Sequence, residues 1–554
     1  MTGAVSGVVR TAMPHLIVAP VLLPMLCAGV MIVLAEHRRP LKLVLGATST
    51  LVGILISLAL LLGVDRGGPV TYLVSNWPVP FGIALAVDRL SATMLLLTWI
   101  LGGAALLYGS ARWHRVGVHF PALFQLQLMG LSGAFLTADI FNLFVFFEIL
   151  LAASYGLLLH GAGESRVRAS VRYVAVNVVA SSVFLIGIAT IYGVTGTLNM
   201  AELAARLSGA SVANRHLVDA GATLLAVAFL IKAAAWPLNF WLAPAYRAAS
   251  PPAAAMFAVL TKVGVYTLVR LWNLMFAGGP LAGFGADGLF VFGLGTALLA
   301  GFGMLASHRI AAQASWGVIM SAGTLVAALG TREPAALGGA LFYLVPSTLA
   351  SAAAFLLADV VDRWEAGATV VEEAPFLTAS LEDEGEVNLD DEAAPLVGRP
   401  IPASIALLGF AYMTCALLIA GFPPLPTFLG KAAMLRAAIG LAADGGAGLH
   451  AAAFAGVILV CGLLGLVALT RTGIRTFWSG GGRHPPVVRA AEALPVLALL
   501  GLCGALTLAA GPAMRLAQTT AASLRDRQEY IEAVRRASVT PPPGSPRGLE
   551  DVPR

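Results

Sequence analysis

Residues 141–161 read FNLFVFFEILLAASYGLLLHG, an apolar run that holds a single acidic residue, Glu148. A helix needs about 20 apolar residues to cross the hydrocarbon core of a bilayer, and this run is long enough. In lipid the backbone must satisfy its own hydrogen bonds, so only helices and closed barrels span a membrane. Barrel strands alternate polar and apolar residues over about ten positions, and this run does not. It therefore predicts a transmembrane helix.

The same pattern recurs along the chain. Hydrophobic residues make up 58% of the 554 residues and charged residues only 11%, against roughly 25% charged in soluble globular proteins. That composition excludes a soluble enzyme, a nucleic-acid-binding module and a disordered scaffold, because it leaves too little polar surface. We expect an all-α polytopic membrane protein with about 14 transmembrane helices, near 15–35, 42–64, 90–109, 121–138, 139–161, 170–194, 217–243, 250–277, 287–306, 309–330, 335–360, 401–440, 450–470 and 490–511.

Two of these segments carry prolines that should break a helix. Pro237 interrupts 217–243, and the run GFPPLPTFLGK (421–431) interrupts 401–440. Proline lacks the N–H of the helix bond and clashes with the carbonyl four residues back. The sequence PLNFWL (237–242) resembles PLPTFL (424–429), and each lies in the fourth span of a five-span group. This pattern favours a repeat transporter with two discontinuous helices.

The predicted organisation has five parts. A three-helix region is followed by two five-helix repeats, one last transmembrane helix, and an amphipathic and disordered tail. An acidic loop, with nine acidic and no basic residues between Glu372 and Glu392, interrupts the second repeat and is interpreted as solvated chain. The boundaries are 1–120, 121–277, 287–470 with the loop at 362–400, 490–511 and 512–554.

Basic residues in the loops indicate the orientation, because they accumulate on the cytoplasmic side. With the N-terminus outside, sixteen basic residues fall in inside loops. Eight fall outside: Arg10, Arg66, Arg89, Arg206, Arg215, Arg270, Arg332 and Arg436. This bias favours an outside N-terminus, and an even number of spans then places the C-terminus outside as well. Four arginines of the tail argue against that second placement: Arg525, Arg527, Arg535 and Arg536.

The chain uses lysine in a distinctive way. It has 34 basic residues but only four lysines, and three of these lie inside apolar runs: Lys232 in AFLIKAAAW, Lys262 in AVLTKVGVY and Lys431 in TFLGKAAML. A charge at the centre of a membrane helix costs roughly 2.5–3.5 kcal/mol on insertion scales. Arginine stays protonated, whereas a buried lysine can release its proton. We interpret the three lysines as a proton relay; snorkelling or a structural ion pair is the alternative.

A buried cation needs a counter-charge, and Glu148 is the only acidic residue well inside an apolar segment. We hypothesise that it pairs with Lys232 as a charge switch, in which the proton on one group changes the affinity of the other. His308, at the start of the tenth span, is a further relay candidate or else an interfacial residue. Asp139 is interpreted as a helix N-cap.

No cofactor or metal is expected. The four cysteines, Cys27, Cys415, Cys461 and Cys503, lie singly in apolar runs without a CxxC pair or a histidine at metal-ligand spacing. The net charge of +5 is small and scattered, so we expect no nucleic acid as a partner.

Three stretches carry a family resemblance: TADIFNLFVFFEILLAASYGLLL (137–159), IKAAAWPLNFWLAPAYRAASPPAAAMFAVLTKVGVYTLVRL (231–271) and GFPPLPTFLGK (421–431). They resemble the proton-translocating membrane subunits shared by respiratory complex I and Mrp-type antiporters, and most of all the D subunit of the multisubunit Mrp-type cation/proton antiporters. The resemblance implies two inverted five-helix repeats and a bacterial inner-membrane complex of about seven subunits that exchanges Na⁺ or K⁺ for H⁺. It implies a role for Glu148, Lys232, Lys262 and Lys431.

The sequence departs from the family at two places in 340–358. Pro346 stands where many relatives have histidine, and Ser351 where several have lysine. Two alternatives therefore stay open beside an antiporter subunit. One is a proton-pumping subunit of an NADH-quinone oxidoreductase or energy-converting hydrogenase, and the other is a structural subunit that does not transport.

Overall fold

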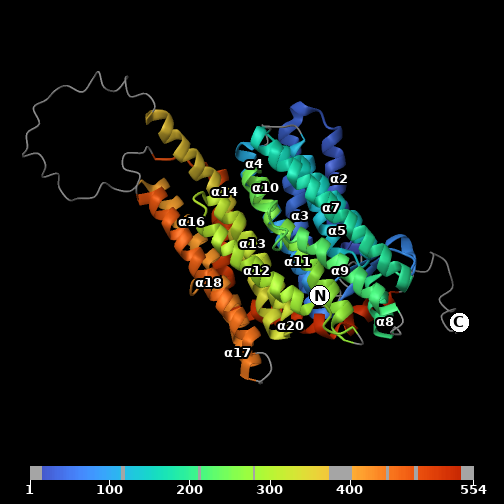
Figure 1. The fold of residues 1–554 in the computed structure, drawn as a ribbon. Helices are drawn as coiled ribbons and strands as arrows, with labels where there is room; N and C mark the ends of the chain where they lie inside the picture. Colours follow the sequence, from blue (N-terminus) through green and yellow to red (C-terminus); the bar gives the residue numbers. More distant parts are fainter. Residues whose placement is uncertain are drawn as a thin grey trace, which may run out of the picture.

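The protein is described from a computed structural model, which places residues 15–113, 119–161, 163–209, 214–278, 281–372, 402–443, 448–478 and 485–537. The long helices stand side by side in one elongated bundle (Figure 1). Eleven helices are long and apolar enough to cross a bilayer, and two shorter apolar helices, α2 and α5, are also present. The all-α polytopic fold is confirmed, and the number of 14 spans stays a prediction.

The N-terminal region comprises helices α2 (Ala19–Val33), α3 (Arg39–Gly67) and α4 (Arg89–Ala111). Single 3-10 turns lie at Glu36–Arg38 and Val74–Asn76. Between α3 and α4 lies an antiparallel pair of strands, β1 (Val70–Leu73) and β2 (Ala84–Val87). Asp88 begins α4: its carboxylate accepts the backbone N–H of Ser91, whose hydroxyl accepts the N–H of Asp88. This reciprocal cap satisfies two donors that a helix start leaves unpaired.

The rest of the bundle follows in chain order. The first half holds α5 (Phe120–Leu136), α6 (Ile140–Leu159), α7 (Glu164–Thr195), α8 (Met200–Gly209), α9 (Arg215–Lys232), α10 (Leu242–Ala248) and α11 (Pro251–Phe276). The second half holds α12 (Ala286–Leu305), α13 (Ile310–Gly330), α14 (Pro334–Glu372), α16 (Ala403–Ala420), α17 (Pro426–Ala443) and α18 (Gly448–Gly473), which continues as a π-helical turn at Ile474–Trp478. The chain then forms α19 (Ala490–Leu508), α20 (Ala510–Asp526) and α21 (Gln528–Arg535).

Three helices form the centre of the molecule. The apolar windows of α11, α13 and α14 are buried almost completely, whereas those of α3, α18 and α19 are about one-third buried. Helices that are apolar on all sides belong in a core or against lipid, and this bundle has both kinds. The central row α11–α13–α14 therefore lies away from the bilayer, and the outer helices present leucine and valine to it.

Both predicted breaks are present. Residues 233–241 separate α9 from α10, and residues 421–425 separate α16 from α17. At the first break Ala234 adopts a positive φ of 53°, and the Trp236 N–H donates to the Thr296 hydroxyl on α12 at 2.8 Å. A neighbouring helix thus satisfies backbone that the break exposes, as a non-helical stretch at membrane depth requires.

Two segments differ from the expected boundaries. Helix α14 continues to Glu372, so residues 362–372 are helical and the acidic loop begins later than expected. Most of that loop, like the predicted disordered end of the tail, lies outside the described residues. The described part of the tail forms two helices, which are divided at Arg527, a residue with a positive φ of 49°.

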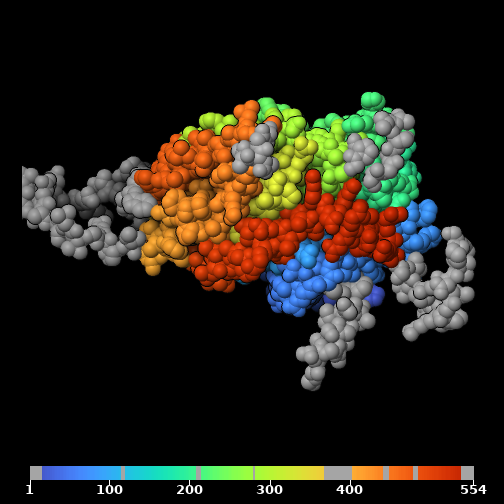
Figure 2. Space-filling model, turned by 90° about the horizontal axis from the view of Figure 1, so that it is seen from below, coloured from blue at the N-terminus to red at the C-terminus, as the bar shows by residue number. Residues whose placement is uncertain are grey.

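The tail crosses one end of the bundle. In Figure 2, which views that end, the red C-terminal segment forms a continuous band between the yellow and blue parts of the surface. Helix α20 contacts α14, α11 and α4, and α21 contacts α8 and β1. The tail therefore touches both halves of the chain and the N-terminal region.

Candidate functional site

Lys232 is the last residue of α9 and lies at the first break. Its Nζ donates to the Ser181 hydroxyl of α7 at 3.3 Å, and the Ser181 hydroxyl donates to the Glu148 carboxylate of α6 in a short hydrogen bond. The Lys232 ammonium also lies 4.8 Å from the centre of the Phe147 ring. Ser181 thus stands between Glu148 and Lys232, and the two groups are joined through its hydroxyl instead of a direct ion pair.

Lys262 lies in the middle of α11 and has no exposed surface. Its Nζ donates to the Ser321 hydroxyl and, at 3.3 Å, to the Val318 carbonyl, both on α13. No carboxylate forms an ion pair with it among the residues the structure describes. This lysine is held by neutral oxygen atoms alone.

A close backbone contact joins the surroundings of Lys232 and Lys262. Gly264 of α11 faces the first break: a Cβ at this position would lie 2.8 Å from the Ala233 nitrogen and 3.0 Å from the Lys232 carbonyl carbon. Only glycine lets the two backbones approach so closely. The break that begins after Lys232 therefore packs directly on the helix that carries Lys262.

Lys431 lies on α17, just after the second break. Its Nζ donates to the Ala420 carbonyl, the last residue of α16, at 2.8 Å, and lies 5.8 Å from the centre of the Tyr343 ring. The carbonyl end of a helix carries partial negative charge and favours a cation. Gly421, with a φ of +80°, makes room for the lysine, since a Cβ there would lie 2.7 Å from Nζ.

The remaining predicted residues lie elsewhere. His308 is exposed in the connection between α12 and α13, where its carbonyl accepts from Arg475, and the structure does not bring its ring to the buried lysines. Ser351 lies on buried α14 and donates to the Ser347 carbonyl at 2.8 Å. Pro346 stands within the same helix. The Ser351 hydroxyl is thus bonded within its own helix.

Asp139 caps α6 as expected, accepting the Asn142 N–H at 2.8 Å. Within the described part of the chain no group of three or more His, Cys, Asp or Glu residues could hold a metal ion.

Two ion-pair clusters are not predictable from the sequence pattern. At the end of α11, Arg270 donates two hydrogen bonds of 2.6 Å to Asp88. Burial alone would raise the pKa of Asp88, but the charge and hydrogen bonds of Arg270 hold it below its usual value. The expectation that Arg270 belongs to an outside loop is wrong, because α11 extends to Phe276 and its end is covered.

The second cluster joins α4, α14 and α19. Glu492, which has no exposed surface, accepts from Arg112 at 3.0 Å and from Arg363 at 2.9 Å. Arg363 also contacts Asp359 at 3.3 Å, and Asp359 accepts the Tyr108 hydroxyl at 2.6 Å. The sequence shows that charged residues lie at the ends of apolar segments. It does not show which of them pair, because the partners lie on helices far apart in the sequence.

Comparison with known proteins places the chain in a family. The family described as "NADH:quinone oxidoreductase/Mrp antiporter, TM" matches residues 137–377. The D subunit of a probable K⁺/H⁺ antiporter of Rhizobium meliloti is 47% identical over 92% of this chain and 95% of its own length. The D subunit of a Na⁺/H⁺ antiporter of Bacillus subtilis is 32% identical over 94% of this chain and 99% of its own length.

Solved structures show the same architecture. The Mrp complex from Dietzia sp. DQ12-45-1b contains a chain that matches with a TM-score of 0.78 and 25% identity, over 94% of this chain and 99% of that one. A chain of respiratory complex I from Thermus thermophilus matches with a TM-score of 0.70 and 22% identity, over 92% of this chain and 99% of that one. The second likeness is one of fold.

The fold and the antiporter relatives define a multi-pass membrane protein of the ion-transport class, a transporter component and not an enzyme. More particularly, the chain belongs to the family of D subunits of the Mrp-type cation/proton antiporters, within the superfamily that includes the antiporter-like subunits of complex I. It is therefore one component of a multisubunit antiporter complex.

Proposed function

We propose that the protein is an ion-translocating subunit of a Na⁺ or K⁺/proton antiporter of about seven subunits in a bacterial inner membrane, with its N-terminus outside. Protons move through a buried relay of Glu148, Lys232, Lys262 and Lys431, and His308 lies at the helix end where the relay meets solvent. The observation that supports this proposal is the bonding of the three buried lysines to hydroxyl and carbonyl oxygens. An ammonium group without a directly paired carboxylate is not locked in its charged form.

Ser181 supplies a route for one proton step. Its hydroxyl contacts both Lys232 and Glu148, so it can pass its own proton to the Glu148 carboxylate while it accepts one from the Lys232 ammonium. The products are a neutral amine and a neutral carboxylic acid, and the reverse step restores both charges. The membrane potential favours charge movement by about 2.3 kcal/mol per elementary charge per 100 mV.

The test is ΔpH-driven cation exchange by the whole complex in vesicles, measured separately with Na⁺ and with K⁺. We expect Glu148→Ala, Lys232→Ala and Lys262→Ala to abolish exchange with either ion while the complex still assembles. Lys42→Ala is the matched control, because Lys42 is also buried but lies in the first turn of α3, away from the relay. Full activity in both Glu148→Ala and Lys232→Ala would remove the mechanism.

The same experiment addresses the two alternatives. A structural subunit that does not transport predicts an assembled Lys262→Ala complex with unchanged exchange. A subunit of a redox-driven pump predicts co-purification with NADH- or iron–sulfur-binding subunits instead of small antiporter subunits. The 47% identity to an antiporter subunit favours our proposal, whereas the likeness to complex I is one of fold.

A further inference from the structure

Helix α11 carries a polar stripe that leads away from Lys262. Lys262, Tyr266 and Arg270 follow at intervals of four residues, which places them on one helix face. The Tyr266 hydroxyl donates to the Phe135 carbonyl at 2.8 Å, and Arg270 donates to the same hydroxyl at 3.5 Å. The stripe therefore runs two helical turns, from the central lysine toward the end of α11.

The stripe ends in a permanent positive charge. Arg270 is 3% exposed, makes the two-pronged bond to Asp88, and lies 4.8 Å from the centre of the Tyr530 ring of α21. Arginine cannot be deprotonated in a protein, so this charge persists at every physiological pH. Asp88 balances it, which a buried guanidinium requires.

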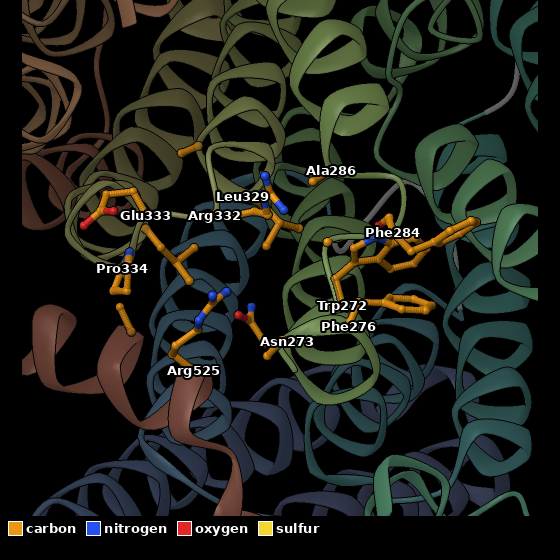
Figure 3. Close-up of a pocket in the computed structure, with 15 residues that line it drawn as sticks. Trp272, Asn273, Phe276, Phe284, Ala286, Leu329, Arg332, Glu333, Pro334 and Arg525 are labelled. Carbon is orange, nitrogen blue, oxygen red and sulfur yellow. Dashed lines mark hydrogen bonds between the residues drawn. The ribbon is translucent and has the colours of Figure 1, made fainter. Parts of the chain in front are cut away.

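Two small hollows with charged residues in their lining flank this end of α11. One, of about 10 Å³, lies between α4, α11 and the tail, and its charged lining is Asp88, Arg89, Arg270, Arg527 and Glu529. The other, of about 30 Å³, is shown in Figure 3, where Arg525 of α20, Arg332 and Glu333 before α14, and Asn273 of α11 surround one space. Asp88 keeps 12% of its side chain exposed. The hollow beside Asp88 is about large enough for one water molecule, so water can reach the pair at the covered end of α11.

We propose that Arg270, paired with Asp88, is the electrostatic barrier that prevents protons from passing directly between Lys262 and the surface covered by the tail. The inference rests on the proposed relay, which makes Lys262 a proton carrier. A proton that moves along the stripe from Tyr266 must pass close to the Arg270 guanidinium, and at that short range its positive charge repels the proton in a medium of low dielectric constant, although Asp88 cancels the charge of the pair at longer distance. A pore-lining arginine excludes protons from channels by the same physics. In the proposed orientation this surface is the outer one, where protons arrive.

In an exchanger, such a barrier would prevent an uncoupled proton leak. A proton that reached Lys262 directly from outside would cross without a counter-moving cation and would dissipate the gradient. Closing the short route along α11 leaves only the route that is coupled to cation movement. Arg270 and Asp88 therefore keep proton movement coupled to cation movement, and they do not themselves carry protons.

The experiment measures passive proton leak through the complete complex. Vesicles loaded with a pH dye receive a pH jump in choline buffer without Na⁺ or K⁺, with a lipophilic ion present to cancel the membrane potential. The variant Arg270→Gln/Asp88→Asn removes both charges, and the new asparagine amide still offers the oxygen that caps α4. We expect the leak to rise about ten-fold, equivalent to about 1.4 kcal/mol of barrier. Adding Lys262→Ala should return the leak to the wild-type level.

Two controls separate charge from packing. Arg270→Lys/Asp88→Glu keeps both charges and should leak no more than the wild type. Tyr530→Ala changes only the tail: it removes the aromatic ring over Arg270 and keeps the Arg270–Asp88 pair. Its proton leak should also equal that of the wild type. An increased leak in Tyr530→Ala would overturn the proposal, because the cover and not the charge would then be the seal; this holds even if the double variant does not assemble.

Three further results are decisive. An assembled double variant with wild-type leak would make the pair purely structural. A double variant that loses cation exchange but does not leak protons would show that the Arg270–Asp88 pair belongs to the conduction route, and this result would also disprove the barrier. The proposed relay is judged separately, by exchange in Lys262→Ala, so the barrier and the relay can fail independently.

Discussion

At the scale of single residues, the arginines and the buried lysines of the bundle have different partners. Arg270 and Arg363 bond to carboxylates near the ends of the bundle, whereas Lys232, Lys262 and Lys431 bond to hydroxyl and carbonyl oxygens within it. A guanidinium keeps its charge and must be neutralised, but an amine can shed its charge with its proton. The choice of partner therefore follows from what each side chain is able to do.

Ser181 gives the first prediction. Ser181→Ala should lower the exchange rate of the complex by about ten-fold, since a hydrogen bond to a charged group contributes about 1.5–3 kcal/mol and no other hydroxyl in the described part of the chain is shown joining Glu148 to Lys232. Ser182→Ala is the matched control, because the Ser182 hydroxyl is exposed and bonds to the Val178 carbonyl of its own helix. Ser181→Thr should restore exchange. Equal rates for Ser181→Ala and the control would show that Ser181 is not on the route.

The positions of the buried lysines could be predicted from the sequence, but their partners could not. Ser181 is 33 residues from Glu148 and 51 from Lys232, and one serine among many on an apolar helix gives no local signal. Which hydroxyl faces a lysine depends on how three helices pack. The Arg270–Asp88 pair could not be predicted for the same reason: its members are 182 residues apart and meet only when the helices pack.

At the scale of elements, the two helix breaks are the features that the sequence predicts best, because each contains proline. The sequence predicts where a helix must stop, because a missing N–H and a steric clash are local facts. It does not predict what satisfies the exposed backbone. Thr296 on α12 does so for Trp236, and the close approach of Gly264 on α11 supports the other side of the same break.

Gly264 gives a prediction for this element. Gly264→Ala should lower the free energy of unfolding by about 1–3 kcal/mol, the usual cost of overpacking, because the new Cβ would lie 2.8 Å from the Ala233 nitrogen. Gly193→Ala on α7 is the control, since nothing lies within 4 Å of a Cβ there. Thermal unfolding of the purified complexes compares the two. A Gly264→Ala complex as stable as the control would mean that the break is free to move aside.

At the scale of the whole molecule, ion pairs around two buried carboxylates, Asp88 and Glu492, hold together helices from distant parts of the chain. Glu492 on α19 holds Arg112, just after α4, and Arg363 on α14 at one end of the bundle. Arg270 on α11 holds Asp88 before α4 at the end covered by the tail. Composition and hydropathy predict the helices, but each pair is a property of the assembled bundle.

Glu492 gives the prediction at this scale. Glu492→Gln should destabilise the protein by about 1.5–3 kcal/mol, because the neutral amide replaces a buried carboxylate that accepts charge-assisted hydrogen bonds from the partly exposed Arg112 and Arg363. Glu164→Gln removes one partner of an exposed pair, with side chains 77% and 88% accessible, and should cost about 1 kcal/mol or less. Urea unfolding in detergent distinguishes the two. Equal stabilities would show that solvent reaches the Glu492 cluster freely.

The tail helix α20 contacts helices of the first half, the second half and the N-terminal region, yet it is among the last segments to be synthesised. During translation the earlier spans must enter the bilayer before helix α20, which contacts them, has been synthesised. A ribosome that stops short of residue 510 would leave a chain whose spans are inserted but whose far end is unfastened. Quality-control proteases could then recognise incomplete copies by the bare surface that α20 normally covers.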